Sequence, residues 1–438
     1  MRRDLISIDD SARLVDQVQS AIARKRPLRI RGGDSKAFLG RRVDGEEIDT
    51  RSHRGIVSYD PSELVITARA GTPLAELNAI LDDAGQMLPC EPPTYGQAAT
   101  MGGMVATGLS GPRRPWAGSV RDFLLGCRIV TGEGKHLRFG GEVMKNVAGY
   151  DVSRLMSGSF GCLGLLTEVS MKVLPKPRET RCLSLALEAG EAMRELSAWR
   201  RAALPVSGAC HVDGRLHVRL EGGTGSVRAA VDRIGGAHLD EDFWTSLREQ
   251  RLPFFDDDRP LWRLSLPNAT PLVDLPGTVM LDWGGAQRWL KSDARAEVIR
   301  GIAGAAGGYA TCFTPDAATD PSIRSPRRSC VFTRSSSNAS IRTAYSIRAG
   351  CTPTTDAIET HKPCKRISAT KPRRSRARRK PKTSCVRACI ADSATPPARP
   401  INCWATSSMD RAAASISSSR CWKASRSPKR RSCISTAA

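Results

Sequence analysis

The chain has 438 residues and a formal net charge of +23, which at first favours a nucleic-acid or anionic-membrane partner. Residues 1–320 carry 41 Lys and Arg against 40 Asp and Glu, whereas residues 321–438 carry 26 against 4, so the charge excludes such a partner for the front of the chain. Of the 38 glycines, 37 lie before residue 321, and no leucine follows it. We expect a globular enzyme followed by a disordered tail rich in Arg, Ser and Cys.

The thiols and the N-terminus bear on the compartment. Six cysteines are scattered through the front part, which favours reduced thiols in a cytosolic protein. The first residues include two arginines but no apolar segment, so we expect no signal peptide. No apolar run is long enough to span a bilayer, so we expect membrane contact only through partners. The sequence predicts no metal site.

The first elements follow from apolar spacing. A helix is predicted after Asp10 or Ser11, with Pro27 ending it, followed by a strand over residues 28–31. That strand leads into a turn of Gly32, Gly33, Asp34, Ser35 and Lys36. Successive N–H groups in such a turn form a nest for a phosphate; the alternative is a plain β-turn. Strands over 56–59 and 64–70 and a helix from residue 74 that Gly85 ends are predicted next.

A second glycine-rich segment follows the rigid stretch 88–93. Thr100 offers a hydroxyl, and Gly102, Gly103 and Gly108 let backbone amides approach phosphate oxygens. Two arginines after it, Arg113 and Arg114, complement a pyrophosphate charge or are simply solvated. Residues 121–131 and 136–139 are expected to form a hairpin around the turn 132–135.

The third glycine-rich stretch, residues 145–164, leads into a strand over 165–173 whose alternating residues predict that it is half-buried. Glycines here let a bulky ligand lie close to the main chain, and Asn146 and Ser159 are available to bond a planar polar ring. The stretch therefore predicts a flavin site, or alternatively a glycine-rich hairpin without a ligand.

These three segments, in this order, resemble the FAD-binding domain of the vanillyl-alcohol oxidase type. The stretches RGGDSKAFLGR, MLPCEPPTYGQAATMGGMVATG, FGGEVMKNVAGYD and DWGGAQRWLK are similar to the FAD-binding subunit of bacterial glycolate oxidase (glycolate dehydrogenase) over about residues 1–315. The resemblance implies an α+β fold with a two-subdomain FAD-binding domain, residues 1–175, a smaller α+β cap, residues 176–315, and the tail, residues 316–438.

The resemblance also implies which residues bind the cofactor. The pyrophosphate is expected between the first two segments and the flavin beside the third. Because Asp34 stands where a histidine can occur in relatives with covalent FAD, non-covalent FAD is expected. The residues implied are Gly32, Gly33, Asp34, Ser35, Thr100, Met101, Gly102, Gly103, Gly108, Lys145, Asn146, Gly149, Tyr150, Asp151, Gly161, Gly164 and Leu165.

The implied function is oxidation of glycolate or a related 2-hydroxy acid to glyoxylate, with electrons passing through the flavin to a partner iron–sulfur subunit. A second flavoprotein subunit is the other implied partner. The conceivable polar site groups of the cap are His211, His217 and Arg263, but both histidines fit packing or surface positions better. No general base can be assigned from the sequence, so the catalytic residues are left open.

The tail departs from the family, which closes its cap with a segment ending near N-P-G-R. Stretches such as KPRRSRARRKPK favour a slipped reading frame near residues 315–325. Two alternatives stay open: a genuine basic tail that binds nucleic acid, and an inactive frameshifted product. Cys385 and Cys389 lack the partners of a zinc site.

Overall fold

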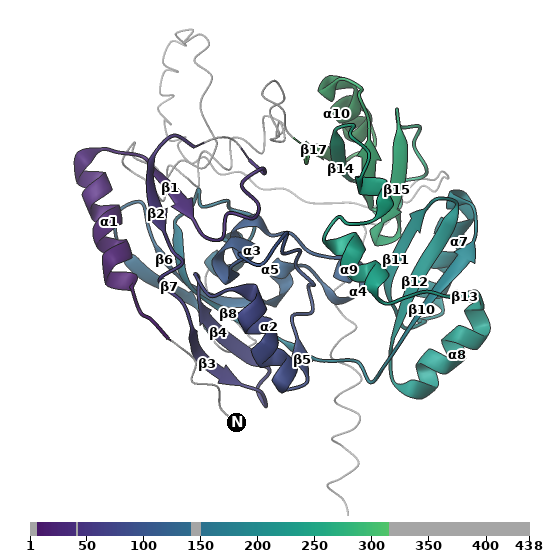
Figure 1. The fold of residues 1–438 in the computed structure, drawn as a ribbon, viewed down its shortest axis with the longest axis horizontal. Helices are drawn as coiled ribbons and strands as arrows, with labels where there is room; N and C mark the ends of the chain where they lie inside the picture. Colours follow the sequence, from purple (N-terminus) through teal and green to yellow (C-terminus); the bar gives the residue numbers. More distant parts are fainter. Residues whose placement is uncertain (1–6, 41–42, 142–149, 315–438) are drawn as a thin grey trace, which may run out of the picture. The chain divides into compact units, whose positions relative to one another are not determined.

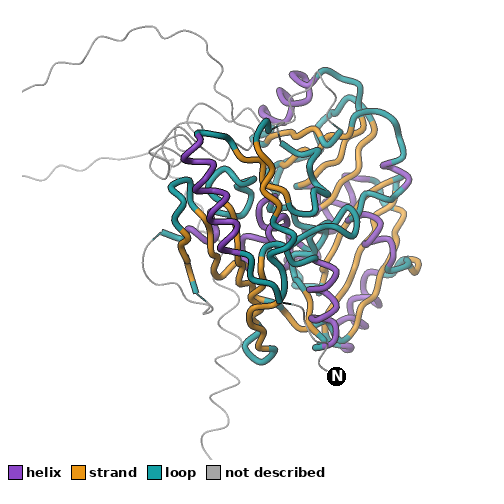
Figure 2. The backbone as a smooth tube through the Cα atoms, turned by 60° about the vertical axis from the view of Figure 1, so that its left-hand side comes forward, coloured by secondary structure: helices purple, strands orange, loops and turns teal. Residues whose placement is uncertain are grey.

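The computed structural model describes residues 7–40, 43–141 and 150–314. Contacts divide the chain into two units, Met1–Asp356 and Ala357–Ala438, and every described residue belongs to the first. The predicted tail, residues 316–438, lies outside the described residues. Figure 1 labels the helices and strands, and Figure 2 shows that loops form much of the path between them.

The N-terminal elements form as the apolar spacing predicts. Helix α1 (Ser11–Arg24) buries Leu14, Val18 and Ala21, and the left-handed Lys25 ends it. Strands β1 (Leu28–Arg31) and β2 (Glu46–Asp49) pair in parallel. The buried stripe of α1 packs with β1 and β2 into one apolar cluster.

A five-stranded antiparallel sheet follows, in the order β3-β4-β8-β6-β7. Its central strand, β8 (Leu165–Lys172), was expected to be half-buried, but six of its eight residues are buried. The reason is that β8 pairs on both edges, and the Ser170 hydroxyl on its polar side bonds Thr67 at 2.8 Å. The other strands are β3 (Ile56–Asp60), β4 (Val65–Arg69), β6 (Leu124–Val130) and β7 (His136–Gly140).

Short helices and a small strand pair complete this part. The predicted helix is α2 (Leu74–Asp83). Two expectations were wrong. The second glycine-rich segment contains a helix, α3 (Met101–Thr107), which Thr100 caps, and residues 120–123 are helical because a capping box of Ser119 and Asp122 starts α5 there. The remaining elements are α4 (Arg114–Ala117), α6 (Val152–Leu155), β5 (Gln86–Met87) and β9 (Leu174–Pro175).

Residues 179–312 form an eight-stranded antiparallel sheet in the order β13-β10-β12-β11-β15-β16-β14-β17. The expected strand over 211–223 is in fact the turn and second strand of a hairpin. The strands are β10 (Glu179–Ala186), β11 (Val206–Val212), β12 (Arg215–Gly222), β13 (Ala237–His238), β14 (Leu261–Ser265), β15 (Thr278–Asp282), β16 (Gln287–Lys291) and β17 (Tyr309–Cys312).

The two faces of this sheet are covered differently. On one face, α7 (Ala189–Arg201), α8 (Thr224–Ile234) and α10 (Ala296–Ala305) pack over apolar side chains. The other face carries α9 (Asp242–Arg248) and η1 (Pro253–Phe255), and it also meets Leu39 and Leu109 from loops of the first half of the chain. A further short helix, η2 (Trp283–Gly285), joins β15 to β16. Loops of the first half thus reach the second sheet.

Candidate flavin site

The three glycine-rich segments of the sequence come together in space. A side chain on Gly33 would place its Cβ 1.4 Å from the Ala98 carbonyl oxygen, so the first segment lies directly against the second. The second meets the third through two backbone hydrogen bonds, from Gly158 N–H to Val105 at 3.0 Å and from Phe160 N–H to Ala106 at 2.9 Å. Residues far apart in sequence are thereby assembled as the resemblance predicts.

The first segment presents a run of backbone donors. Within the described ranges, the N–H groups of Gly33, Asp34, Ser35 and Lys36 donate to no acceptor. Asp34 is left-handed, with φ of 57°, which turns successive N–H groups toward one side. Such nests bind anions, and the two phosphates of FAD are anions of that kind. The residues present therefore fit the cofactor.

The Asp34 side chain points away from this role. Its carboxylate pairs with Arg29 at 2.6 Å and lies 3.9 Å from Arg31. A carboxylate held by two guanidinium groups is not placed like the histidine of covalent flavoproteins. The geometry thus agrees with the expectation of non-covalent FAD without testing it.

In the second segment, the amides are already used by the protein. Thr100 Oγ1 accepts from Gly103 N–H at 3.2 Å, while Met101 and Gly102 donate to the carbonyl groups of Thr72 and Ala70. Met101 is fully buried in the core, and Gly108 ends α3 in the left-handed region. A pyrophosphate contact by Thr100, Met101, Gly102, Gly103 and Gly108 stays a prediction.

The third segment is described only in part. Lys145, Asn146 and Gly149 lie outside the described residues. Tyr150 is 66% exposed, and Asp151 caps α6 by accepting from Arg154 N–H at 3.0 Å.

Gly161 and Gly164 have φ of 78° and 147°, which a side chain would strain. Leu165 packs its side chain beside Leu14 and Val130 in the core. The roles of these residues toward the flavin are untested.

A buried hydroxyl in this segment lacks a partner. Ser159 Oγ is inaccessible to solvent and has no hydrogen-bond partner in the part of the chain that the structure describes. Buried hydroxyl groups are normally satisfied. A polar ring edge held beside the third segment would satisfy it, which is a second reason why the residues fit FAD.

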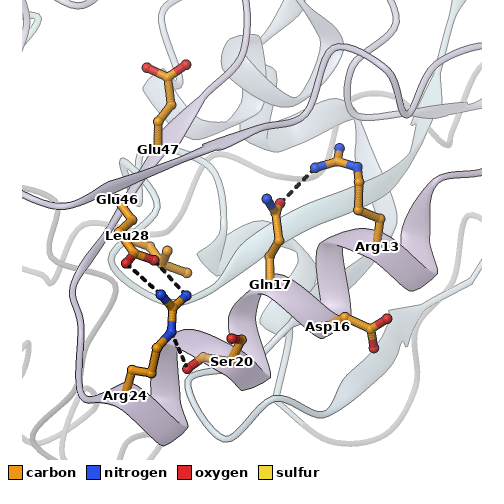
Figure 3. Close-up of a pocket in the computed structure, with 8 residues that line it drawn as sticks. All are labelled: Arg13, Asp16, Gln17, Ser20, Arg24, Leu28, Glu46 and Glu47. Atoms are coloured by element: carbon orange, nitrogen blue, oxygen red, sulfur yellow. Dashed lines mark hydrogen bonds and ion pairs between the residues drawn. The ribbon is translucent and has the colours of Figure 1, made fainter.

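A separate surface pocket lies between α1 and strands β1 and β2 (Figure 3). Its charged side chains satisfy one another: Arg24 bonds Glu46 at 2.9 and 3.0 Å, and Arg13 bonds Gln17 at 2.7 Å. None of the residues implied for the cofactor lines it, so it gives no support for a cofactor site.

The chain is similar to known flavoproteins. Residues 5–140 match the FAD_binding_4 family, an FAD binding domain. Glycolate oxidase subunit GlcE of Escherichia coli K12 is 61% identical over 306 residues, which cover 70% of this chain and 87% of that protein. The chain belongs to the GlcE family of glycolate oxidase subunits.

More distant likenesses agree. Glycolate oxidase subunit GlcD of Bacillus subtilis is 35% identical over 132 residues, 30% of this chain and 28% of that one. A solved structure of alkyldihydroxyacetonephosphate synthase superposes with a TM-score of 0.55 at 17% identity, covering 76% of this chain and 74% of that one, a likeness of fold. The predicted fold class and the prediction of FAD are confirmed, and the GlcE family places the chain among flavin-dependent oxidoreductases.

Two residues of this GlcE-family chain were missed by sequence reasoning. Lys36 follows the amide nest directly, and its ammonium group donates to the Thr94 carbonyl at 3.3 Å and lies 5.5 Å from the Tyr95 ring centre. Burial lowers its pKa to about 8, although the nearby carboxylate of Glu249 opposes this. Glu249 in turn accepts from the N–H groups of Thr94 and Tyr95. Only the position of Lys36 beside the glycines signalled it.

Arg113 is buried in an ion-pair cluster and serves neither of its predicted roles. It pairs with Glu91 at 3.2 Å and with Glu221 of β12. Arg219 also pairs with Glu91, at 2.8 Å. Burial alone would raise the pKa of Glu91, but the charges of Arg219 and Arg113 outweigh it and hold that pKa below its usual range.

The neighbouring Arg114 is engaged as well. Its guanidinium group stacks 4.3 Å from the centre of the Trp283 ring. Neither arginine is therefore simply solvated, and both contact the second half of the chain.

The two histidines of the cap pack as predicted. His217 lies 4.4 Å from the Phe243 ring, and burial lowers its pKa to about 4. His211 bonds the Leu187 carbonyl at 2.9 Å. Within the described ranges, no group of three or more His, Cys, Asp or Glu is arranged to hold a metal ion, and no helix is both long and apolar enough to cross a membrane.

Proposed function

We propose that the chain is the FAD-binding subunit of a complex that oxidises glycolate, or a related 2-hydroxy acid, to glyoxylate. The observation that carries the proposal is the unpaired amide run of residues 33–36 packed against the second glycine-rich segment in a chain 61% identical to GlcE. Residues 1–175 are proposed to bind FAD and residues 176–315 to form the cap. When bound, FAD supplies a two-electron acceptor.

The residues of this chain hold and orient the cofactor. The N–H groups of residues 33–36 bind the phosphates, and Lys36 adds a positive charge beside them. The backbone of Gly161 and Gly164 and the hydroxyl of Ser159 lie along the ring. The cofactor is proposed to be non-covalent, because Asp34 is held by Arg29.

The partners proposed are a second flavoprotein subunit and an iron–sulfur subunit that takes the electrons. The GlcE and GlcD names of the relatives support a multi-subunit enzyme. The complex is proposed to be cytoplasmic, with membrane contact only through its partners.

The test is reconstitution. The FAD-loaded chain, mixed with the two partner subunits from the same genome, is expected to reduce an artificial electron acceptor when glycolate is added, and omission of this chain is expected to abolish the reaction. Unchanged reduction without the chain would contradict the proposal.

Two other functions are tied to the tail alone. A basic tail that binds nucleic acid predicts a salt-sensitive shift of DNA by the peptide 321–438. A frameshifted, inactive product predicts a missing or extra base near the codons for residues 315–325, which resequencing of the locus detects. The composition of that segment, with 26 Lys and Arg against 4 Asp and Glu, is what favours considering them.

A further inference from the structure

A cavity lies where the second sheet meets loops of the first half of the chain. One wall is the sheet face that carries Arg263 of β14 and Asp282 of β15, and the opposite wall is formed by Tyr95 and the loop from Leu109 to Pro112. That loop directly follows the second glycine-rich segment. The cavity therefore adjoins the segments proposed to hold the flavin.

Arg263 brings a positive charge that no acid neutralises. Its Nε is buried without a hydrogen-bond partner, and no ion pair joins it to a carboxylate within residues 7–40, 43–141 and 150–314. Its guanidinium group lies 5.2 Å from the Phe313 ring centre. A buried charge without a partner is strongly unfavourable, so this group is suited to binding an anion from outside the chain.

Asp282 is a buried acid without a cationic partner. Its side chain is 3% exposed and accepts from Trp283 N–H at 2.7 Å and from Gln287 Nε2 at 2.9 Å. A carboxylate has about four acceptor positions, so capacity remains on the cavity side. Burial raises the pKa of Asp282 to about 7, and a group with such a pKa exchanges a proton readily at neutral pH.

The strand register places both groups on one face. Asp282 pairs with Gln287, and Arg263 pairs with Trp289 two residues further along the same strand, β16. Residues two apart on a strand point to the same side. The cation and the acid thus stand diagonally across one strand and face a common space.

We propose that this cavity binds a small 2-hydroxy acid, with Arg263 binding its carboxylate and Asp282 accepting the proton of its hydroxyl. The O–H bond breaks, the proton passes to a carboxylate oxygen of Asp282, and the bonding electrons stay on the substrate oxygen. The inference rests on the function proposed above, in which FAD is the oxidant of the adjacent C–H bond. It assigns the base that the sequence left open.

Other charged groups face Asp282 and set its titration. Glu91 opposes its ionisation and Arg219 favours it, while the Cys210 thiol lies on the paired strand β11. Arg248 lines the same cavity and pairs with Glu249 at 2.8 Å. Glu91 and Arg219 neutralise each other, so the proton on Asp282 is the change expected at neutral pH.

Oxalate, a carboxylate that is not oxidised by this chemistry, is a suitable probe. Its binding to the FAD-loaded full chain is measured by isothermal titration calorimetry from about pH 6 to about pH 8. We expect the affinity to increase as the pH falls through about 7, because a neutral Asp282 no longer repels the anion.

Variants separate the two roles. Arg263→Gln is expected to weaken oxalate binding about tenfold or more, since it removes a charge-assisted hydrogen bond, and Arg263→Lys to restore part of it. Asp282→Asn is expected to keep the affinity but lose its pH dependence, and to lower glycolate turnover about a hundredfold. The exposed residues Arg215 and Asp213 provide matched controls, Arg215→Gln and Asp213→Asn, that should leave all three quantities unchanged.

The outcomes are decisive. Oxalate that fails to bind the FAD-loaded chain, or that binds Arg263→Gln or Arg263→Lys as tightly as the wild type, would overturn the inference while leaving the proposed function intact. A chain that binds no FAD would instead contradict the proposed function, and the same oxalate titration of the FAD-free chain would still decide whether the cavity binds carboxylates. FAD content reports folding of each variant.

Discussion

The carbonyl oxygen of Ala98 occupies the space that a side chain on Gly33 would need, with 1.4 Å between the oxygen and an ideal Cβ. This contact holds the first and second glycine-rich segments together and orients the amide run beside them. The glycine is therefore required by packing between two loops, in addition to any closeness to a ligand.

Gly33→Ala should therefore disrupt the FAD site. Because a backbone atom blocks the new methyl group, the two loops must separate, and overpacking of this kind costs about 1–3 kcal/mol. We expect FAD affinity to fall about tenfold or more, measured by fluorescence titration of FAD.

The control for this change is a glycine in open space. Gly301 lies in α10 with nothing within 4 Å of an added Cβ, so Gly301→Ala should raise stability by about 0.5–1 kcal/mol and leave FAD affinity unchanged. Equal FAD affinity in both variants would contradict the packing argument.

Glu91→Gln should destabilise the fold strongly. The change removes the negative charge that Arg113 and Arg219 share, and loss of one partner of a buried ion pair costs about 3–5 kcal/mol. Urea denaturation measures the free energy of unfolding.

The matched control is an exposed pair. Arg24 and Glu46 have half-exposed side chains, so Glu46→Gln should change the free energy of unfolding by less than about 1 kcal/mol. If both glutamate variants lost similar stability, the buried cluster would not be holding β12 to the loop of Glu91.

Lys36 should make the stability of the FAD-free chain depend on alkaline pH. Its pKa is lowered to about 8 from 10.5, so the unfolded chain binds more protons than the folded chain between those values. The free energy of unfolding should rise with pH across that window, by about 3 kcal/mol at most.

Lys36→Met isolates this contribution. The variant lacks the titrating group, so its advantage over the wild type should shrink as the pH rises from about 8 to about 10.5. A difference between the two proteins that stays constant across this range would show that Lys36 titrates normally.

The sequence predicted elements whose pattern is local. The helix at residues 74–83 and the strand at 165–172 follow from apolar spacing and from terminating Gly and Pro residues, which are properties of neighbouring residues. The predicted meeting of the glycine-rich segments came from the resemblance to a family, because spacing alone does not say which loops touch.

What the sequence could not predict depends on partners distant along the chain. Arg113 was expected in solvent or beside a phosphate, yet its partner Glu221 stands 108 residues away. Asp282 had no motif at all, since its pKa is raised by burial under a sheet face, and burial is a property of the assembled fold. Sequence reasoning therefore found the cofactor segments and missed the acid.

The most direct test of the account is an absorption spectrum of the purified full chain before and after acid precipitation. The account predicts a flavin spectrum in the intact protein, with the yellow colour released into the supernatant by acid, as expected for non-covalent FAD. A chain that stays colourless after addition of FAD, or colour that remains in the precipitate, would contradict it.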